Sequence, residues 1–152
     1  ALAKKAGIVE PELLTVEGHD LKMLEYSCGR WGKLKEPMEL CDYLSFVKEQ
    51  LGANGLRYHD AGRKVEKVAV VSGSGGSYLK YAVSKGCDTF LTSDIKYDVF
   101  LDAKELGINL IDGDHFATEN VVVPVLARYL TGRFPDTEVM ISEKHCQTAR
   151  FI

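Results

Sequence analysis

Short apolar segments alternate with helix-like segments through the second half of the chain, and this alternation constrains the fold most. Residues 65–71, 88–92 and 108–112 have the length and β-branched content of buried strands. Helical stretches, ending at Lys85 and covering 97–106, separate them. Strands joined by helices form βαβ units, in which neighbouring strands run parallel. We therefore predict an α/β fold: a three-layer, largely parallel sheet with flanking helices.

The first third of the chain has a less regular pattern. Residues 1–6 resemble the end of a helix, 21–27 a strand, and 28–32 a loop rich in glycine. A clear helix follows, with Pro37 in its first turn and Gly52 at its end. Its apolar residues recur at helical spacing, at Leu40, Leu44, Val47 and Leu51. We predict one domain, with a mixed lead-in over 1–55, a βαβ core over 56–142, and a last short strand at 138–142.

Composition narrows the class of protein. The 152 residues are 45% apolar and 27% charged, which is typical of one soluble globular domain. A net charge of −3 gives no reason to expect binding to nucleic acid or to an anionic membrane. No apolar run approaches the ~20 residues that span a bilayer. The first residues also lack the apolar core of a signal peptide. We expect a cytoplasmic protein.

The four cysteines do not form a recognisable metal or disulfide pattern. They lie singly along the chain, without a C-x-x-C pair, at Cys28, Cys41, Cys87 and Cys146. We expect reduced thiols that are mostly buried, because a free cysteine packs like a small apolar side chain. His19, His59 and His145 have no acidic or cysteine cluster around them and are expected at the surface.

A glycine loop follows the first predicted strand of the core. Gly73, Gly75 and Gly76 stand where backbone N–H groups could approach a phosphate at the start of a helix. However, Tyr78 occupies the position of the third glycine of a dinucleotide fingerprint, and the Gly-Lys-Ser/Thr ending of a P-loop is missing. The loop is therefore either a tight strand-to-helix turn that packing requires or an anion-binding cradle.

Acidic groups cluster around one histidine after the third predicted strand. If residues 115–119 are helical, His115 and Glu119 share one face and could reach the same metal ion. Asp112 and Asp114 lie in the same turn, and Asp94 follows the neighbouring strand. The alternative is a helix entry that Asp114 caps, with His115 exposed.

Pro124 bears on this geometry, because proline belongs in the first turn of a helix. A helix that begins near residue 120 would leave Glu119 outside it, whereas a continuous helix would kink at Pro124. The segment 116–130 is apolar on nearly every side. Such a helix needs burial all round, so exposure of this surface in a fragment would favour self-association.

Three motifs together resemble one known family. VAVVSGSGGS at 68–77, TSDIKY at 92–97 and DGDHFATE at 112–119 match, in order and spacing, the C-terminal half of the Nif-three-like family. Its members are also known as GTP cyclohydrolase I type 2 homologues. Gly29-Arg30-Trp31-Gly32, followed by Leu34, resembles that family's glycine-arginine loop. The resemblance extends from about residue 2 to near residue 141.

The resemblance implies a fold, a cofactor and an assembly. The family forms two α/β layers around parallel sheets and assembles as a toroidal hexamer with paired divalent metal ions facing the cavity. In the C-terminal half of the family's proteins, the metal ligands are the His and Glu of an H-x-x-x-E motif. These correspond to His115 and Glu119. Zinc, iron and manganese are equally compatible with that ligand set. Asp94, Asp112 and Asp114 are then candidates for supporting the ligands.

The chain also departs from the family pattern. The remaining family ligands, a His pair and an Asp, belong to an N-terminal half that this sequence does not contain, so the chain resembles a fragment. Asp98 stands where the family has His, and Ser27 stands where the first glycine of the glycine-arginine loop is expected. Residues 143–150 lack the usual proline. The chain has no room for the inserted domain of longer members and resembles a short form.

Three functional hypotheses follow from these residues. The first is a metal-dependent hydrolase of the GTP cyclohydrolase kind, acting on a nucleotide or another phosphorylated molecule, with phosphate at the loop of Gly73, Gly75 and Gly76. The second is a non-catalytic, metal-containing binding or regulatory module that forms a ring-shaped homo-oligomer. The third is a nucleotide-binding domain without metal, which depends on the glycine loop alone.

Overall fold

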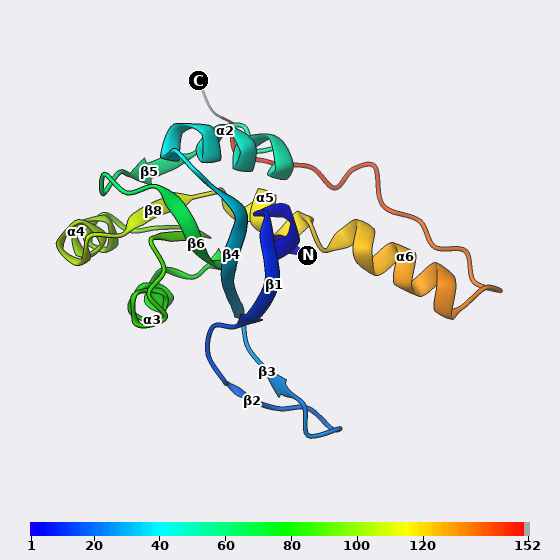
Figure 1. Cartoon of the computed structure of the whole chain (residues 1–152). Helices are drawn as coiled ribbons and strands as arrows, with labels where there is room; N and C mark the ends of the chain where they lie inside the picture. The colour runs from blue at the N-terminus through cyan, green and yellow to red at the C-terminus, as the bar shows by residue number, and fades with distance from the viewer. Residues whose placement is uncertain (151–152) are drawn as a thin grey trace.

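A six-stranded sheet forms the centre of the computed structural model, which describes residues 1–150. The helices are arranged around it (Figure 1). The strands lie in the order β1-β4-β6-β7-β8-β5. Their bounds are Ile8–Leu13 (β1), Gly29–Met38 (β4), Val65–Ser74 (β6), Thr89–Ser93 (β7), Asn109–Asp112 (β8) and Arg57–His59 (β5). A separate two-stranded hairpin consists of Gly18–His19 (β2) and Glu25–Tyr26 (β3).

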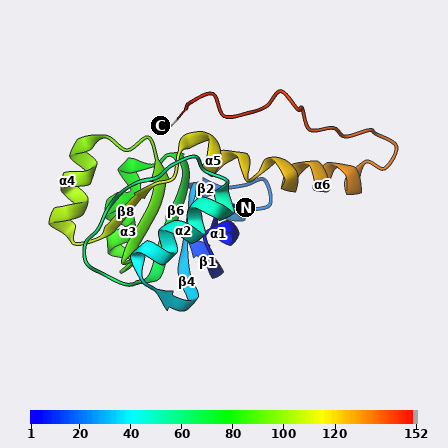
Figure 2. The same ribbon diagram turned by 90° about the horizontal axis from the view of Figure 1, so that it is seen from above.

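Helices cover both faces of the sheet (Figure 2). One side carries α1 (Leu2–Lys5) and α2 (Leu40–Leu51), and the other carries α3 (Leu79–Ser84) and α4 (Tyr97–Leu106). A short 3-10 helix, η1 (Gly76–Tyr78), precedes α3, while α5 (His115–Asn120) and α6 (Val123–Arg133) follow β8. The α/β class and the three-layer arrangement are confirmed.

Strand alternation builds a core on each face. Val68 and Val70 of β6 face the cluster of α1 and α2, whereas Ala69 and Val71 face the cluster of α3 and α4. The central strand β7 is buried over its whole length because both of its faces are covered. In the first cluster the fully buried Tyr43 donates a hydrogen bond from its hydroxyl to Ala6 O, 3.0 Å away. Both faces of the sheet are therefore covered at β7 and β8, whose residues are all buried, polar ones included.

The sheet is mixed rather than largely parallel. Only β6, β7 and β8 run parallel, whereas β1, β4 and β5 pair antiparallel with their neighbours. The segment 28–32 is not a loop, because β4 begins at Gly29. A Cβ atom at Gly29 would lie 2.7 Å from Leu14 Cδ2, and one at Gly32 would lie 2.6 Å from Ile8 Cγ2. These glycines therefore allow neighbouring segments of the same chain to pack closely against β4. In the sequence alone, the same glycines indicate a loop.

Other boundaries also differ from the sequence prediction. Pro37 belongs to β4, so α2 begins later than predicted, at Leu40. Gly52 ends α2 in the left-handed conformation, with φ of +62°, as predicted. Of the strand predicted over 21–27, only Glu25–Tyr26 forms, and 138–142 is not a strand. β1 is irregular, with a register shift between Val9 and Glu12 and a φ of +48° at Glu10.

Helix α6 projects from the body of the molecule (Figures 1 and 2). Pro124 lies in its first turn, so proline starts a new helix here instead of kinking a continuous one. None of its residues is buried. Several large apolar side chains of α6 and of the segments beside it are about half exposed: Val122, Val125, Leu126, Tyr129 and Phe134. The expected exposure of apolar surface in this segment is confirmed.

Two further sequence predictions can be compared with the described residues. All four cysteines are unpaired, but only Cys87 is buried, so the prediction of mostly buried thiols was wrong. The other three lie in the hairpin region, on an outer helix face and in the C-terminal segment, which the core does not reach. Within residues 1–150, no helix has both the length and the apolarity needed to cross a bilayer.

Candidate metal-binding site

Three parallel strands end at one edge of the sheet and bring the predicted site residues together. Gly73 lies at the end of β6, Asp94 directly follows β7, and His115 follows β8 after a two-residue connection. Because β6, β7 and β8 are parallel neighbours, their carboxyl ends share this edge. The parallel strands thus bring together residues that the sequence places after three separate predicted strands.

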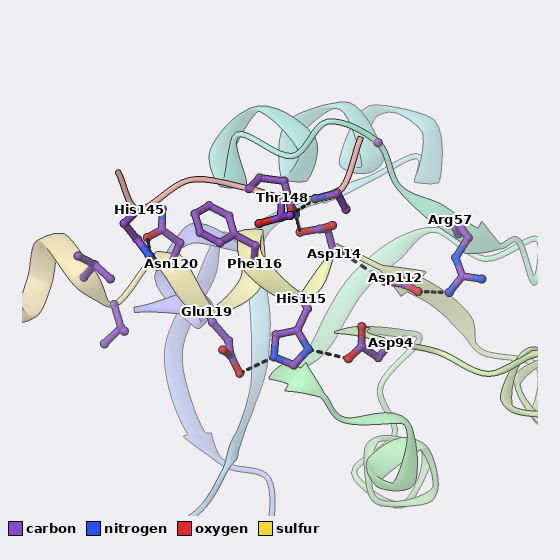
Figure 3. A pocket seen from close by; sticks show the side chains of 15 residues that line it. Arg57, Asp94, Asp112, Asp114, His115, Phe116, Glu119, Asn120, His145 and Thr148 are labelled. Carbon is purple, nitrogen blue, oxygen red and sulfur yellow. Dashed lines mark hydrogen bonds and ion pairs between the residues drawn. The ribbon is translucent and has the colours of Figure 1, made fainter. Parts of the chain in front are cut away.

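His115 lies between two carboxylates (Figure 3). Its Nδ1 is 2.6 Å from Asp94 Oδ2, and its Nε2 is 3.1 Å from Glu119 Oε1. The second pair spans one helical turn of α5, so the i, i+4 spacing places both side chains on one face. All three side chains are about half exposed and can reach a ligand from solvent.

The hydrogen bond with Asp94 is the main cause that raises the pKa of His115, with a smaller contribution from Glu119. In the neutral ring, donation from Nδ1–H to Asp94 leaves the Nε2 lone pair facing the Glu119 carboxylate. A carboxylate on the far nitrogen of a histidine is the usual arrangement behind a metal ligand, because it fixes the tautomer and the ring orientation. Asp94 is therefore well placed to fix the orientation of the His115 ring.

Helix α5 fits both alternatives predicted for the H-x-x-x-E segment, a shared face for a metal ion and a helix entry that Asp114 caps. Asp114 caps it, and its Oδ1 accepts a hydrogen bond of 3.0 Å from Ala117 N. His115 is exposed, as the capping alternative required, yet it still points toward Glu119. The segment forms two helices, α5 and α6, and α6 starts only at Val123. Glu119 therefore lies within α5, on the same face as His115.

Asp112 has a different task from the other acids. It is buried, forms an ion pair with Arg57 Nη2, and accepts a hydrogen bond of 3.2 Å from Ile95 N. Arg57 Nη2 also donates to Ile95 O at 2.9 Å. The pair thus ties the edge strand β5 to the loop after β7, which carries Asp94. Asp112 and Asp114 shape the site's backbone, while Asp94 contacts the imidazole.

The backbone of Gly73 is already occupied by protein contacts. Its N–H donates to Thr118 Oγ1 at 3.1 Å, and its carbonyl accepts from the hydroxyls of Thr92 and Ser93 at 3.0 and 2.6 Å. Its φ is +63°, and a Cβ there would lie 2.4 Å from Glu119 Oε1. Gly73 therefore leaves space for the Glu119 carboxylate, a requirement of packing.

The next glycines also have packing reasons. A Cβ at Gly75 would lie 2.3 Å from Thr92 Oγ1, whereas one at Gly76 would meet only Val99, at 3.5 Å. The geometry of the loop thus favours the tight-turn reading over the anion cradle at Gly73 and Gly75. A phosphate at Gly73, Gly75 and Gly76 stays a prediction that these contacts do not support.

A cavity of about 650 Å³ opens beside the three site residues. The C-terminal segment forms one wall, where His145 Nε2 lies 3.1 Å from Asn120 Oδ1 and Gln147 donates to Asp114 Oδ1. His145 is exposed, as predicted, but its place beside the cavity was not. No local pattern in 143–150 indicates this wall, because its contacts depend on the return of the chain after α6.

The donor set can be compared with what a divalent ion requires. His115 Nε2 and the Glu119 carboxylate are suitable ligands on one helix face, with Asp94 behind the ring. Within residues 1–150, no group of three or more His, Cys, Asp or Glu side chains is placed to hold a metal ion. The residues present therefore offer two suitable ligands to a divalent ion, His115 and Glu119.

The family model Duf34/NIF3 (NGG1p interacting factor 3) matches residues 3–147, nearly the whole chain. The chain belongs to the Duf34/NIF3 family. Among curated relatives, the GTP cyclohydrolase 1 type 2 homolog of Bacillus subtilis (strain 168) is 36% identical over 133 residues, covering 84% of this chain and 35% of that protein. The homolog of Clostridium perfringens is 31% identical over 130 residues, covering 84% of this chain and 50% of that protein.

Solved structures of NIF3 proteins have the same fold. A Bacillus cereus protein related to NIF3 superimposes with a TM-score of 0.73 at 30% identity, covering 85% of this chain and 37% of that protein. A Staphylococcus aureus hypothetical protein reaches 0.81 over 99% of this chain and 62% of its own, at 23% identity, which shows the fold alone. The chain spans about a third to half of the length of the curated NIF3 relatives that it matches.

Proposed function

We propose that this chain contributes His115 and Glu119 as ligands of a divalent metal centre. The observation that carries the proposal is the imidazole held between Asp94 and Glu119, at 2.6 and 3.1 Å. Asp94 orients the ring, and Gly73 leaves room for the Glu119 carboxylate. In the complete protein the centre would hold two divalent ions, such as zinc, iron or manganese, with the remaining ligands outside this chain.

We further propose that the centre serves a metal-dependent hydrolase acting on a nucleotide or a related phosphorylated compound. The names of the curated relatives, GTP cyclohydrolase 1 type 2 homologs, support this reaction class. A bound divalent ion would lower the pKa of a coordinated water and polarise the bond that is attacked. His115 and Glu119 would hold their positions through Asp94 and α5, while the cavity of about 650 Å³ would admit a small molecule.

The exposed α6 favours a second, compatible role. A row of half-exposed apolar side chains on a projecting helix is a surface that another chain can cover. We propose that the protein is a homo-oligomer, a hexameric ring as in the family resemblance. A purely binding or regulatory module would use the same assembly without turnover.

Metal titration tests the ligand assignment. Mn²⁺ added below stoichiometry to the ¹⁵N-labelled chain should broaden amide signals around residues 73, 94 and 115–119. Glu119→Gln keeps the shape of the side chain but removes its charge, so the broadening should vanish while the far-UV circular dichroism stays unchanged. Glu105→Gln makes the same change on the exposed face of α4 and is the matched control. Equal broadening in Glu119→Gln would exclude Glu119 as a ligand.

Turnover of GTP separates the hydrolase from the binding module. The chain alone should not hydrolyse GTP, because two ligands hold a metal ion weakly. Joined to the part of its relatives' length that it does not span, it should release product in a way that chelation abolishes and metal restores. Tight metal binding without any turnover would favour the binding module.

A further inference from the structure

A second cavity shares Glu119 with the first, and a partly buried arginine lines it. This cavity measures about 450 Å³, and its walls include Ser27, Arg30, Ser72 and Glu119. Glu119 also lines the larger cavity that contains His115. Both cavities therefore have a proposed metal ligand in their walls.

The register of the sheet explains why Arg30 lies there. Arg30 on β4 is directly opposite Val70 on β6, and Val70 faces the core of α1 and α2. Ser72 lies two residues further along β6 and therefore points to the same face. The strands thus place Arg30 and Ser72 on one face of the sheet and in the wall of one cavity, which Glu119 also lines.

The charge of Arg30 has no protein partner among residues 1–150. Its Nη1 donates to the carbonyls of Ser27 and Gly29, at 3.0 and 2.8 Å. Within the described part of the chain no carboxylate lies within 4.0 Å of its guanidinium, whereas Arg57 is paired with Asp112. The other arginines of residues 1–150 are exposed, but Arg30 is partly buried. A partly buried guanidinium attracts an anion more strongly than a fully exposed one does, because less water screens its charge.

We propose that this second cavity binds a phosphate group through the Arg30 guanidinium and the Ser72 hydroxyl. A planar guanidinium matches two phosphate oxygens with parallel hydrogen bonds. The inference rests on the proposed function, since the phosphate would belong to the substrate whose reacting bond lies at His115 and Glu119. The phosphate would then contact Arg30 and Ser72 on β4 and β6. The backbone of Gly73 is less suitable, because its N–H and carbonyl already bond to protein atoms.

The position of Glu119 in both cavities predicts opposite effects on the binding of phosphate and of Mn²⁺. The negative carboxylate faces the same cavity as the proposed anion and opposes its binding. Neutralising that charge should therefore strengthen phosphate binding. Glu119→Gln should bind phosphate at least as tightly as the parent chain, although it loses the effect of Mn²⁺.

Inorganic phosphate is the probe for the test. It is titrated into the ¹⁵N-labelled, metal-free chain at constant ionic strength, and the amide signals of Ser72 and Gly73 and the Nε–H signal of Arg30 are followed. We expect saturable shifts at these groups. Arg30→Gln should weaken binding at least about tenfold, the loss expected for charge-assisted hydrogen bonds. Arg63→Gln makes the same change on an exposed arginine and should leave the affinity unchanged.

Further variants and probes keep the test decisive. If circular dichroism shows that Arg30→Gln does not fold, Arg30→Lys and Ser72→Ala replace it, and both should weaken binding. Acetate should bind more weakly than phosphate, because it carries one charge and two oxygens. Unchanged phosphate affinity in the folded Arg30 and Ser72 variants, or shifts without saturation, would overturn the proposal. Arg30-dependent phosphate binding without any Mn²⁺ effect would overturn the metal centre and leave this site standing.

Discussion

Replacing Gly73 with alanine separates the space-making role of the glycine loop from its backbone conformation. At Gly73 φ is +63°, and the added Cβ would meet Glu119 Oε1 at 2.4 Å. Gly62 is the matched control, because its φ is +71° and a Cβ there would meet no atom within 4 Å. Both substitutions force an alanine into the left-handed region. Only the first also displaces the carboxylate.

The two stability costs should be similar. A left-handed alanine costs about 1–2 kcal/mol, and the smaller entropy of the unfolded chain offsets about 0.4–1 kcal/mol of this. Each variant should therefore lose about 1 kcal/mol, or about 2–4 °C in Tm. In Gly73→Ala the flexible, half-exposed Glu119 can rotate away, so its lost contact with His115 adds only about 0–1 kcal/mol.

The effects on the site should differ completely. Urea unfolding followed by circular dichroism gives the two stabilities, and Mn²⁺ broadening of the signals of residues 115–119 reports on the site. We expect near-equal stabilities, with broadening retained in Gly62→Ala and lost in Gly73→Ala. Retained broadening in Gly73→Ala would refute the idea that Gly73 exists to admit the Glu119 carboxylate. A much larger loss of stability than in Gly62→Ala would show that the loop cannot relax around the new methyl group.

Three more outcomes can be measured on the same chain. Burial raises the pKa of Cys87 to about 11, so this thiol should react with a disulfide reagent far more slowly than the exposed Cys41 and Cys146; four equally fast thiols would contradict the buried position. Hydrogen bonds, first from the Cys28 thiol and then from Thr15, lower the pKa of Glu17 from 4.5 to about 2. The stabilisation of the folded state by the ionised Glu17 is therefore fully present above pH 4.5 and is lost as the pH falls toward 2. A carboxyl ¹³C titration of Glu17 with a midpoint near 4.5 would contradict these hydrogen bonds. The apolar α6 should make the chain self-associate, so sedimentation velocity should show concentration-dependent species that Leu126→Gln reduces; a monomer at all concentrations would contradict this prediction.

The sequence predicted β7, α4 and β8 to within one residue at each end, because local signals agree there with the tertiary fold. The helix predicted over 97–106 has these bounds in the structure, between Lys96 and a left-handed Gly107. The i, i+4 spacing in α5 likewise predicted the approach of His115 to Glu119. Periodicity and end signals depend on neighbouring residues, so a single sequence contains them.

Features that depend on distant residues could not be predicted in this way. The Arg57–Asp112 pair joins residues 55 positions apart. The register of β4 against β6 sets Arg30 opposite Val70, and no carboxylate of the described residues pairs with it. The glycines of 28–32 indicated a loop because the sequence does not show that Leu14 and Ile8 press against them. In the same way, a helix that is apolar all round indicates burial but does not identify what covers it.

The irregular β1 determines how copies of this chain can meet. It is an edge strand of the sheet, and its register shift, the left-handed Glu10 and the missing N–H of Pro11 interrupt the row of backbone groups that another strand would need. The charges of Glu10 and Glu12 further disfavour such pairing, because a second copy would bring like charges together. Growth of the sheet from one molecule into the next, the route to fibrils, is thus blocked at this edge. At this edge, an ordered contact between copies therefore has to be made by side chains and not by the backbone of β1.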